Sequence, residues 1–445
     1  MISFRPRHTI NLMIGALLIL IGSGCDILDV SNPNNLTEDQ IGPTSIVPLA
    51  NGAEAAVTRA LGTVHGPYST ATGELRHIGS RNAWGQLDDG AIDTPGNEFS
   101  DSAYPYLSEA VWLTRTNIER METFQENDNL REVQPLVRTY LYAAIAYTTT
   151  ADVFDNFVLS DQRDASEPVG SGNMDSLYDQ AITWLDRGIS IAESNDVDQP
   201  SLATLYAMRA RAKYSRALWQ KLNPSVNTSS PLVNNSGAVA DAQEALSRMS
   251  GDVTYELELI SSSPGLVDGA VSVAFQINNR RELQFSERYI ETNANNEFES
   301  VTFEDLISGN VHPYLQSFIT SYRNQGQYAD IPVVSQREMY LILAEAALAG
   351  NPNLDFGSQI NSLRSLDDLP DFTGQVNARA LLERSREVNL FLQGRRLADH
   401  YRFGDPAAQW GGNRDAPGTF LHHPNGDSLE SELKSVTPLT LCQSA

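Results

Sequence analysis

The sequence predicts a mostly α-helical protein, with helical hairpins of the tetratricopeptide type as a scaffold and an irregular, loop-rich region that holds a few short strands. Two observations lead to this prediction. Apolar residues recur at helical spacing across 44–65, 102–222 and 336–403, as they do on the buried face of a helix. The stretch 223–335 is instead rich in Ser, Asn and Gly, with only short strand-like runs such as 271–277.

The helical patterns can be placed one by one along the chain. Leu107, Val111, Ile118 and Met121 fall on one helix face, and a second face repeats from Leu136 to Tyr147. Helices over 176–193 and 201–222 are expected to form one antiparallel hairpin, although no repeat of about 34 residues is traceable. Further helices are predicted over 337–348, 357–365 and 378–402.

A Gly- and Asp-rich stretch over 66–101 interrupts the helical patterns and is predicted to be one long loop. Loops of this length without secondary structure of their own are often functional.

The first 25 residues have the layout of a bacterial export signal. Arg5 and Arg7 precede a ten-residue apolar run and three small residues, and a run this short does not span a bilayer. Cys25 follows at once, which predicts lipidation and cleavage that makes Cys25 the mature N-terminus. The alternative is an ordinary secretory signal that leaves a soluble periplasmic protein. The Asn-, Asp- and Pro-rich segment 25–43 is then an extended tether.

Charge and motifs exclude several classes of function. The net charge of −25 disfavours binding to nucleic acid or to anionic lipid, so membrane attachment is expected to come from acyl chains. No nucleophile elbow, phosphate-binding glycine loop or zinc signature is present. We therefore expect no enzymatic activity and no cofactor or metal, apart from one hypothesis of a weak calcium site among Asp88, Asp89 and Asp93.

The charged residues of 378–402 invite a catalytic interpretation, with Glu387 and His400 as candidate groups. At their i, i+3 spacing, Arg396, Asp399 and Arg402 are instead expected to form an ion-pair ladder that locks this helix to its neighbours.

Three segments resemble one known family. CDILDVSNPNNLT at the lipidation site, REMYLILAEAAL, and ERSREVNLFLQGRRLADHYRFG are similar to segments of the SusD/RagB family of outer-membrane nutrient-binding lipoproteins. The tail 404–445 departs from the family, because it lacks the usual Phe-Pro-Ile-Pro ending. The resemblance implies a signal peptide over 1–24 and a SusD-like domain over 44–445. It also implies a position on the outer face of the outer membrane and, as partner, a TonB-dependent transporter resembling SusC.

Capture of a glycan needs flat apolar faces for the sugar rings and polar groups for their hydroxyls. Trp84, with Arg81 and Asp88 nearby in the predicted long loop, is the first choice for a stacking platform, and simple packing of the loop is the alternative. The resemblance implies a second wall from the irregular region, where Arg280, Tyr289 and Tyr322 are the candidates. Trp410 has three open roles: ligand binding, transporter contact or packing.

The leading hypothesis is a non-catalytic, lipid-anchored protein that captures an oligosaccharide or polysaccharide and passes it to the transporter. A peptide ligand on the same architecture would need a groove that offers backbone hydrogen bonds. A glycoside hydrolase or lyase on a helical scaffold would need two carboxylates about 5 to 9.5 Å apart across a cleft. A structural adaptor of the cell envelope would show a concave helical groove without a pocket.

Overall fold

The computed structural model describes residues 41–90, 97–159, 166–223, 229–259 and 272–404. The described residues from Ile46 onward belong to one compact unit, whereas the short turn η2 (Pro43–Ser45) belongs to another. The features predicted at Cys25 and Trp410 lie outside the described residues. The predicted domain boundaries stay a prediction.

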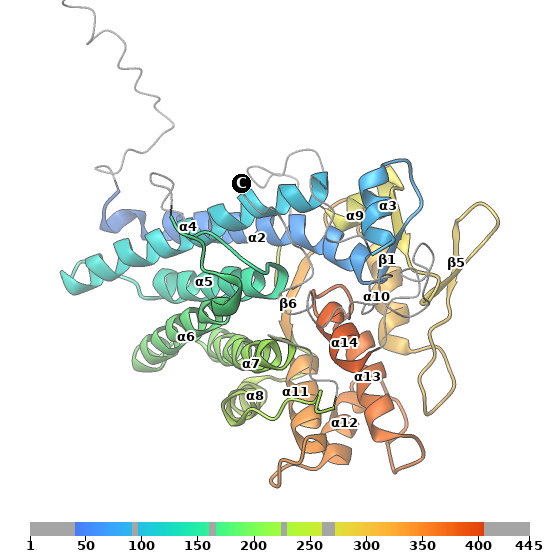
Figure 1. Ribbon diagram of the computed structural model, residues 1–445. Helices are drawn as coiled ribbons and strands as arrows, with labels where there is room; N and C mark the ends of the chain where they lie inside the picture. The colour runs from blue at the N-terminus through green and yellow to red at the C-terminus, as the bar shows by residue number, and fades with distance from the viewer. Residues whose placement is uncertain (1–40, 91–96, 160–165, 224–228, 260–271, 405–445) are drawn as a thin grey trace, which may run out of the picture. The chain divides into compact units, whose positions relative to one another are not determined.

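The described chain is mostly helical, which confirms the predicted fold class (Figure 1). The helices are α2 (Ile46–Ala71), α3 (Asn82–Asp88), α4 (Glu98–Glu126), α5 (Gln134–Val153), η3 (Ser171–Asn173), α6 (Ser176–Ser194), α7 (Gln199–Leu222), α8 (Ser236–Arg248), α9 (Val273–Phe275), η4 (Gln276–Arg280), α10 (Pro313–Asn324), α11 (Gln336–Leu348), α12 (Phe356–Ser365), α13 (Ala378–Asn389) and α14 (Arg396–Phe403). None of the described helices is both long and apolar enough to cross a membrane.

Three antiparallel strand pairs complete the described architecture. They are β1 (Leu75–His77) with β3 (Leu283–Phe285), β2 (Thr254–Leu257) with β6 (Ile331–Ser335), and β4 (Ile290–Thr292) with β5 (Phe298–Val301). In the first pair, Leu75 lies opposite Phe285 and His77 opposite Leu283. This pair joins the N-terminal helices to the irregular region.

The scaffold helices bury the faces that the sequence predicts. Leu107, Val111, Ile118 and Met121 of α4 are buried, and so is the stripe of α5 from Leu136 to Tyr147. Helices α6 and α7 run side by side as the expected hairpin (Figure 1). Burial of an apolar side chain stabilises the fold by about 1.5 to 3 kcal/mol, so these stripes hold the hairpins together.

The predicted long loop over 66–101 is wrong. Helix α2 continues through Pro67 to Ala71, and the stretch also contains β1, the whole of α3 and the start of α4. A proline inside a helix removes one backbone hydrogen bond, but most of the α2 residues around it are buried against other elements. Tertiary packing therefore outweighs the local cost.

The irregular region differs from its prediction in two ways. It contains two helices that the sequence reading missed, α8 and α10. The strand expected over 271–277 is instead helical from Val273, because α9 continues directly into the π-helical turn η4. The β-branched residues of this run are outweighed by contacts of α9 with α2.

The single helix predicted over 378–402 is broken into α13 and α14. Leu392 and Gly394 take left-handed conformations, with φ of 56° and 68°. The Leu392 N–H donates to the buried carboxylate of Glu74 at 2.8 Å. A contact between residues this far apart in sequence fixes the break.

A buried ion-pair cluster links α7, α11, α13 and α14. Arg402 is fully buried and donates to Glu345 and to Asp399, while Arg386 donates to Asp399 at 2.9 Å. Burial alone would raise the pKa of Asp399, but Arg386 and Arg402 outweigh it and bring the pKa to about 2. The predicted pairing of Asp399 with Arg402 is confirmed, and Arg396 contacts Glu387 at 3.4 Å.

Candidate functional site

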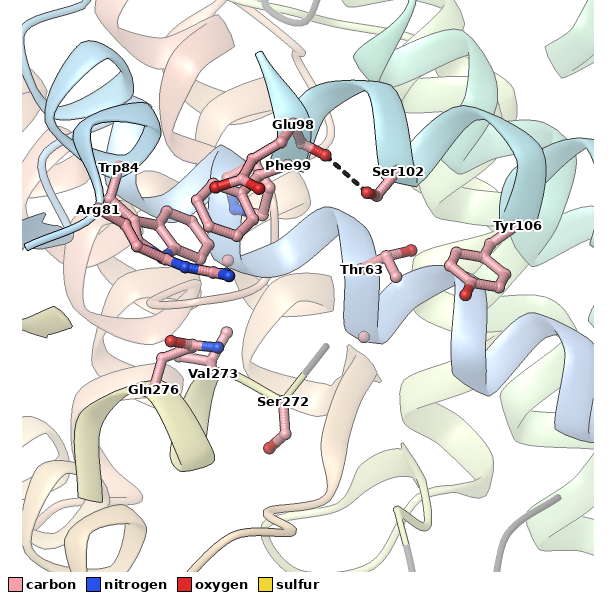
Figure 2. A pocket seen from close by; sticks show the side chains of 13 residues that line it. Thr63, Arg81, Trp84, Glu98, Phe99, Ser102, Tyr106, Ser272, Val273 and Gln276 are labelled. Atoms are coloured by element: carbon pink, nitrogen blue, oxygen red, sulfur yellow. Dashed lines mark hydrogen bonds between the residues drawn. The ribbon is translucent and has the colours of Figure 1, made fainter. Parts of the chain in front are cut away.

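A cavity of about 230 Å³ lies where the middle of α2, the residues from Arg81 into α3, the start of α4 and the α9–η4 segment meet (Figure 2). We call it the Arg81 cavity. Its lining residues are Gly62, Thr63, Gly66, Pro67, Arg81, Trp84, Glu98, Phe99, Ser102, Tyr106, Ser272, Val273 and Gln276.

The side of the cavity formed by α2 is hollow because of its small residues. Gly62 and Gly66 lie one turn apart and have no side chains to fill the space. A Cβ added at Gly66 would lie 3.1 Å from Cη2 of Trp84. Pro67 also lacks the N–H that the Thr63 carbonyl would accept in a regular helix. This part of α2 therefore combines empty space with a backbone carbonyl, that of Thr63, which lacks its usual helical donor.

The aromatic wall of the cavity consists of Trp84 and Phe99. Their rings are stacked, with centroids 3.7 Å apart and planes inclined by 18°. Trp84 is only 1% exposed, so it does not form the open platform in a loop that the sequence predicted. It belongs to α3, and Phe99 covers its ring. A ligand in the cavity would meet an edge of this stacked pair.

The stacked pair is held together by Asn97, which caps α4. The Asn97 side chain accepts hydrogen bonds from the N–H groups of Phe99 and Ser100. Its amide nitrogen donates to the Ala83 carbonyl at 2.9 Å and to Gln86 at 3.0 Å. One buried amide therefore fixes the end of α3 that carries Trp84 to the start of α4 that carries Phe99.

Trp84 also carries a buried hydrogen-bond donor. Its Nε1 is buried and has no hydrogen-bond partner within the described part of the chain. Buried polar groups in native proteins nearly always have a partner. A hydroxyl or carboxylate oxygen of a bound molecule would satisfy this group.

Arg81 immediately precedes α3, and its guanidinium lies 5.6 Å from the centroid of the Phe99 ring. It makes no ion pair with any described residue. Ser102 and Tyr106 add hydroxyls to the cavity, and Glu98 adds an exposed carboxylate (Figure 2). The cavity therefore combines an aromatic wall with donors and acceptors.

The position of Arg81 depends on Glu282, which follows η4. The Glu282 carboxylate accepts the N–H groups of Ser80 and Arg81, both at 3.0 Å. Its carbonyl accepts the N–H groups of Ile78 and Gly79 at 3.0 and 3.2 Å. Burial opposes ionisation of Glu282, but the N–H groups of Arg81 and Ser80 that donate to its carboxylate outweigh burial and hold its pKa below the ordinary value.

Two predicted site residues lie in the core instead. Tyr289 is 1% exposed and donates to Glu387 at 3.0 Å. Tyr322 is 9% exposed and stacks on Phe318. Tyr322 borders a hollow of about 20 Å³ that shares Gly62, Ser272 and Val273 with the Arg81 cavity. Neither tyrosine lines the Arg81 cavity itself, where Ser272, Val273 and Gln276 lie instead, and their role in ligand binding stays a prediction.

Two other predicted residues flank the cavity without lining it. Asp88 ends α3 and accepts the His77 N–H at 3.1 Å. Arg280 ends η4, is exposed, and lies on the same helical turn as Gln276.

Sequence reasoning missed Phe99 and Gln276, because the signals in these segments are a helix cap and a short apolar run, neither of which predicts a cavity.

Neither the carboxylates nor the histidines gather as a metal site in the described residues. The calcium hypothesis stays a prediction, since Asp93 lies outside those residues. Glu387 is buried and receives hydrogen bonds from Arg288 and Tyr289, so its environment is that of a structural ion pair.

Comparison with known proteins relates the chain to others by fold. No model of a known protein family matches the sequence, and no curated protein matches it either. Solved structures do match. A SusD superfamily protein from Bacteroides thetaiotaomicron is 11% identical, with a TM-score of 0.57 over 82% of this chain and 89% of that chain.

Two further structures agree with the first. A SusD superfamily protein from Parabacteroides distasonis is 14% identical, with a TM-score of 0.57 over 91% of this chain and 97% of that one. A protein from Bacteroides vulgatus described as a proposed sugar-binding protein is 14% identical, with a TM-score of 0.53 over 81% and 86%. At these identities the likeness concerns the fold.

Proposed function

Because the chain has the fold of SusD superfamily proteins, we propose that it is a non-catalytic binding protein that captures an oligosaccharide in the Arg81 cavity. The observation that carries this proposal is the combination of the Trp84–Phe99 wall with the Arg81 guanidinium, which lies over Phe99, and with the Trp84 Nε1, which has no partner among the described residues. Sugar rings offer apolar faces and hydroxyl acceptors together. The proposed sugar-binding relative supports the same class of ligand.

Capture would serve uptake into the cell. We propose that Cys25 carries the lipid anchor, that the protein faces the cell exterior from the outer membrane, and that a TonB-dependent transporter resembling SusC receives the ligand. The export-signal layout and the resemblance of the sequence support these steps. Incorporation of labelled palmitate, lost in Cys25→Ala, tests the anchor. Co-purification of a transporter with the native protein tests the partner.

The ligand is tested by calorimetric binding of the purified protein to a panel of oligosaccharides, with released reducing ends assayed in parallel. Arg81→Gln should weaken binding about tenfold, since it removes charge-assisted hydrogen bonds. Trp84→Phe should weaken it about fivefold through loss of one donor, while most of the stacked ring volume remains. Arg131→Gln removes an exposed arginine on the α4–α5 connection and should have no effect.

Two outcomes would contradict the proposal. Release of reducing ends would identify a hydrolase or lyase. Absence of binding to every glycan, together with binding of peptides, would show that the ligand is a peptide.

A further inference from the structure

Most arginines in the described structure are paired with carboxylates. Arg211 pairs with Glu338, Arg364 with Asp305, and Arg337 with Asp252 and Asp367. This is expected in a chain with 56 carboxylates and 31 basic residues. An arginine without an acidic partner is therefore an exception.

Three such exceptions lie together beside the cavity, and we call Arg280, Arg281 and Arg323 the arginine cluster. None of them makes an ion pair with a described residue. Asn278 of η4 donates to the Tyr322 carbonyl at 3.1 Å and to the Gly326 carbonyl at 2.8 Å. These bonds fasten the turn that carries Arg280 to the end of α10 that carries Arg323.

Two arginines of the cluster, Arg281 and Arg323, are close enough to repel one another. Burial, and then the charge of Arg281, lower the pKa of Arg323. The Arg323 guanidinium lies 4.0 Å from the centroid of the Phe298 ring, and its Nη1 is buried with no partner among the described residues. The repulsion between the guanidinium groups destabilises the folded protein, and an anionic group bound beside them would relieve it.

The cluster is connected to the Arg81 cavity through the backbone. Arg281 adjoins Glu282, the residue whose carboxylate accepts the N–H groups of Ser80 and Arg81. Gln276, at the other end of η4, lines the cavity. A chain-like ligand that leaves the cavity along η4 would therefore meet the arginine cluster.

A simpler explanation covers only part of this pattern. Arg280 and Arg323 lie in the last turns of η4 and α10, where a cation stabilises the carbonyl end of a helix. Arg281 is the C-cap of η4, with a left-handed φ of 54°, so the same explanation applies to its charge. The helix ends do not account for the Arg323 Nη1, which has no partner among the described residues.

We infer that the glycan captured in the Arg81 cavity is acidic, with carboxylate or sulfate groups that Arg81 and the arginine cluster recognise. This inference rests on the proposed function and specifies its substrate class. Guanidinium groups bind both anions in a bidentate manner. Glu98, the acidic residue of the lining, opposes the anion and makes the site selective for a ligand whose charges lie toward the arginines.

The test compares polymers that differ in charge but share a backbone. Polygalacturonate oligomers are set against their methyl esters, and dextran sulfate against dextran, so the two arms distinguish carboxylate from sulfate. The full chain should bind one charged member at least about tenfold more tightly than its neutral counterpart. Raising the salt from about 0.05 to about 0.5 M should weaken that binding and leave neutral binding unchanged.

Variants assign the effect to the arginines. The double variant Arg280→Gln/Arg281→Asn keeps a residue that tolerates the left-handed conformation at 281, and it should lose about tenfold in affinity for the charged polymer only. Glu98→Gln should tighten charged binding by about threefold, since it removes a repulsion. Arg131→Gln removes one positive charge from an exposed site on the α4–α5 connection and should leave both affinities unchanged.

The possible failures are distinct. Equal or tighter binding of neutral polymers, insensitive to salt and to the double variant, would overturn the acidic ligand while the proposed function stands. An equal loss in Arg131→Gln would show a general charge effect and would also overturn it. Absence of binding to every polymer and to neutral oligosaccharides would remove the proposed function itself.

Discussion

The contact between Gly79 and Glu282 yields a sharp prediction about how the site is held. A Cβ built at Gly79 would lie 2.2 Å from Oε2, 2.6 Å from Cδ and 2.7 Å from Cα of Glu282. Because Cα belongs to the backbone, rotation of the side chain cannot relieve the overlap. Gly79 is not among the residues with positive φ, so the effect of Gly79→Ala comes from space alone.

The magnitude follows from the groups that must move. Overpacking costs about 1 to 3 kcal/mol, and separation of the two segments weakens hydrogen bonds worth about 1 kcal/mol each. We expect Gly79→Ala to lower the free energy of unfolding by about 3 kcal/mol. The matched control is Gly52→Ala in α2, where nothing lies within 4 Å of the added Cβ and helix propensity should give a gain of up to about 1 kcal/mol.

Urea denaturation of the two variants and the parent protein measures both effects, and ligand affinity gives a second readout. Gly79→Ala should also weaken glycan binding about tenfold, because Ser80 and Arg81 move with Gly79. If Gly79→Ala were as stable as Gly52→Ala, the close approach to Glu282 would not exist in solution. If it lost stability but kept full affinity, Glu282 would not position Arg81.

Two further predictions concern buried carboxylates. Glu345→Gln should cost about 3 to 5 kcal/mol in urea denaturation, because it leaves two buried arginines, Arg386 and Arg402, to share the single carboxylate of Asp399. Glu383→Gln, on an exposed helix pair, should cost less than about 0.5 kcal/mol, and similar costs would contradict the argument. Burial raises the pKa of Glu74 to about 7, so the folded protein binds this proton more tightly than the unfolded chain and loses stability as pH rises from about 4 to above 7. The unfolding free energy of the parent protein should fall between pH 5 and pH 8, and in Glu74→Gln this fall should be smaller by about 3 kcal/mol. An identical pH dependence in both proteins would refute the assignment.

The scaffold was predictable because its signals are local. The faces of α4 and α5 appear as apolar residues at helical spacing, and every residue named for them is buried. The start of α11 carries an N-cap, in which the Ser335 hydroxyl accepts the N–H of Glu338 at 3.2 Å. Patterns of this kind need no knowledge of distant partners.

The errors fall where distant contacts decide the local structure. The break between α13 and α14 depends on Glu74, which lies more than 300 residues before Leu392. The Gly- and Asp-rich composition from residue 66 onward suggested that the first helix ends there, but burial of the following turn keeps that turn helical. Neither outcome has a signal in the neighbouring sequence.

The candidate site was only half predictable for the same reason. Arg81 and Trp84 were identified because they are a cation and an aromatic residue in a stretch rich in Gly and Asp. The opposite wall depends on the pairing of β1 with β3, which brings residues about two hundred positions apart together. Composition favoured Tyr289 and Tyr322 for that wall, but apolar contacts draw both into the core.

Buried donors near the cavity differ from the buried arginines of the ion-pair cluster in their partners. In the scaffold, buried arginines such as Arg402 and Arg386 have carboxylate partners at short distance. Around the cavity, the Trp84 Nε1 and the Arg323 Nη1 are buried without partners in the described structure. Buried groups without partners also occur elsewhere in the described part of the chain, such as the Arg248 Nε and the His312 Nδ1, so it is the position of Trp84 in the cavity wall that connects its donor with a ligand. Because both groups are donors, the molecule that completes the site must bring acceptor oxygens, and the nearby arginines favour acceptors that carry negative charge.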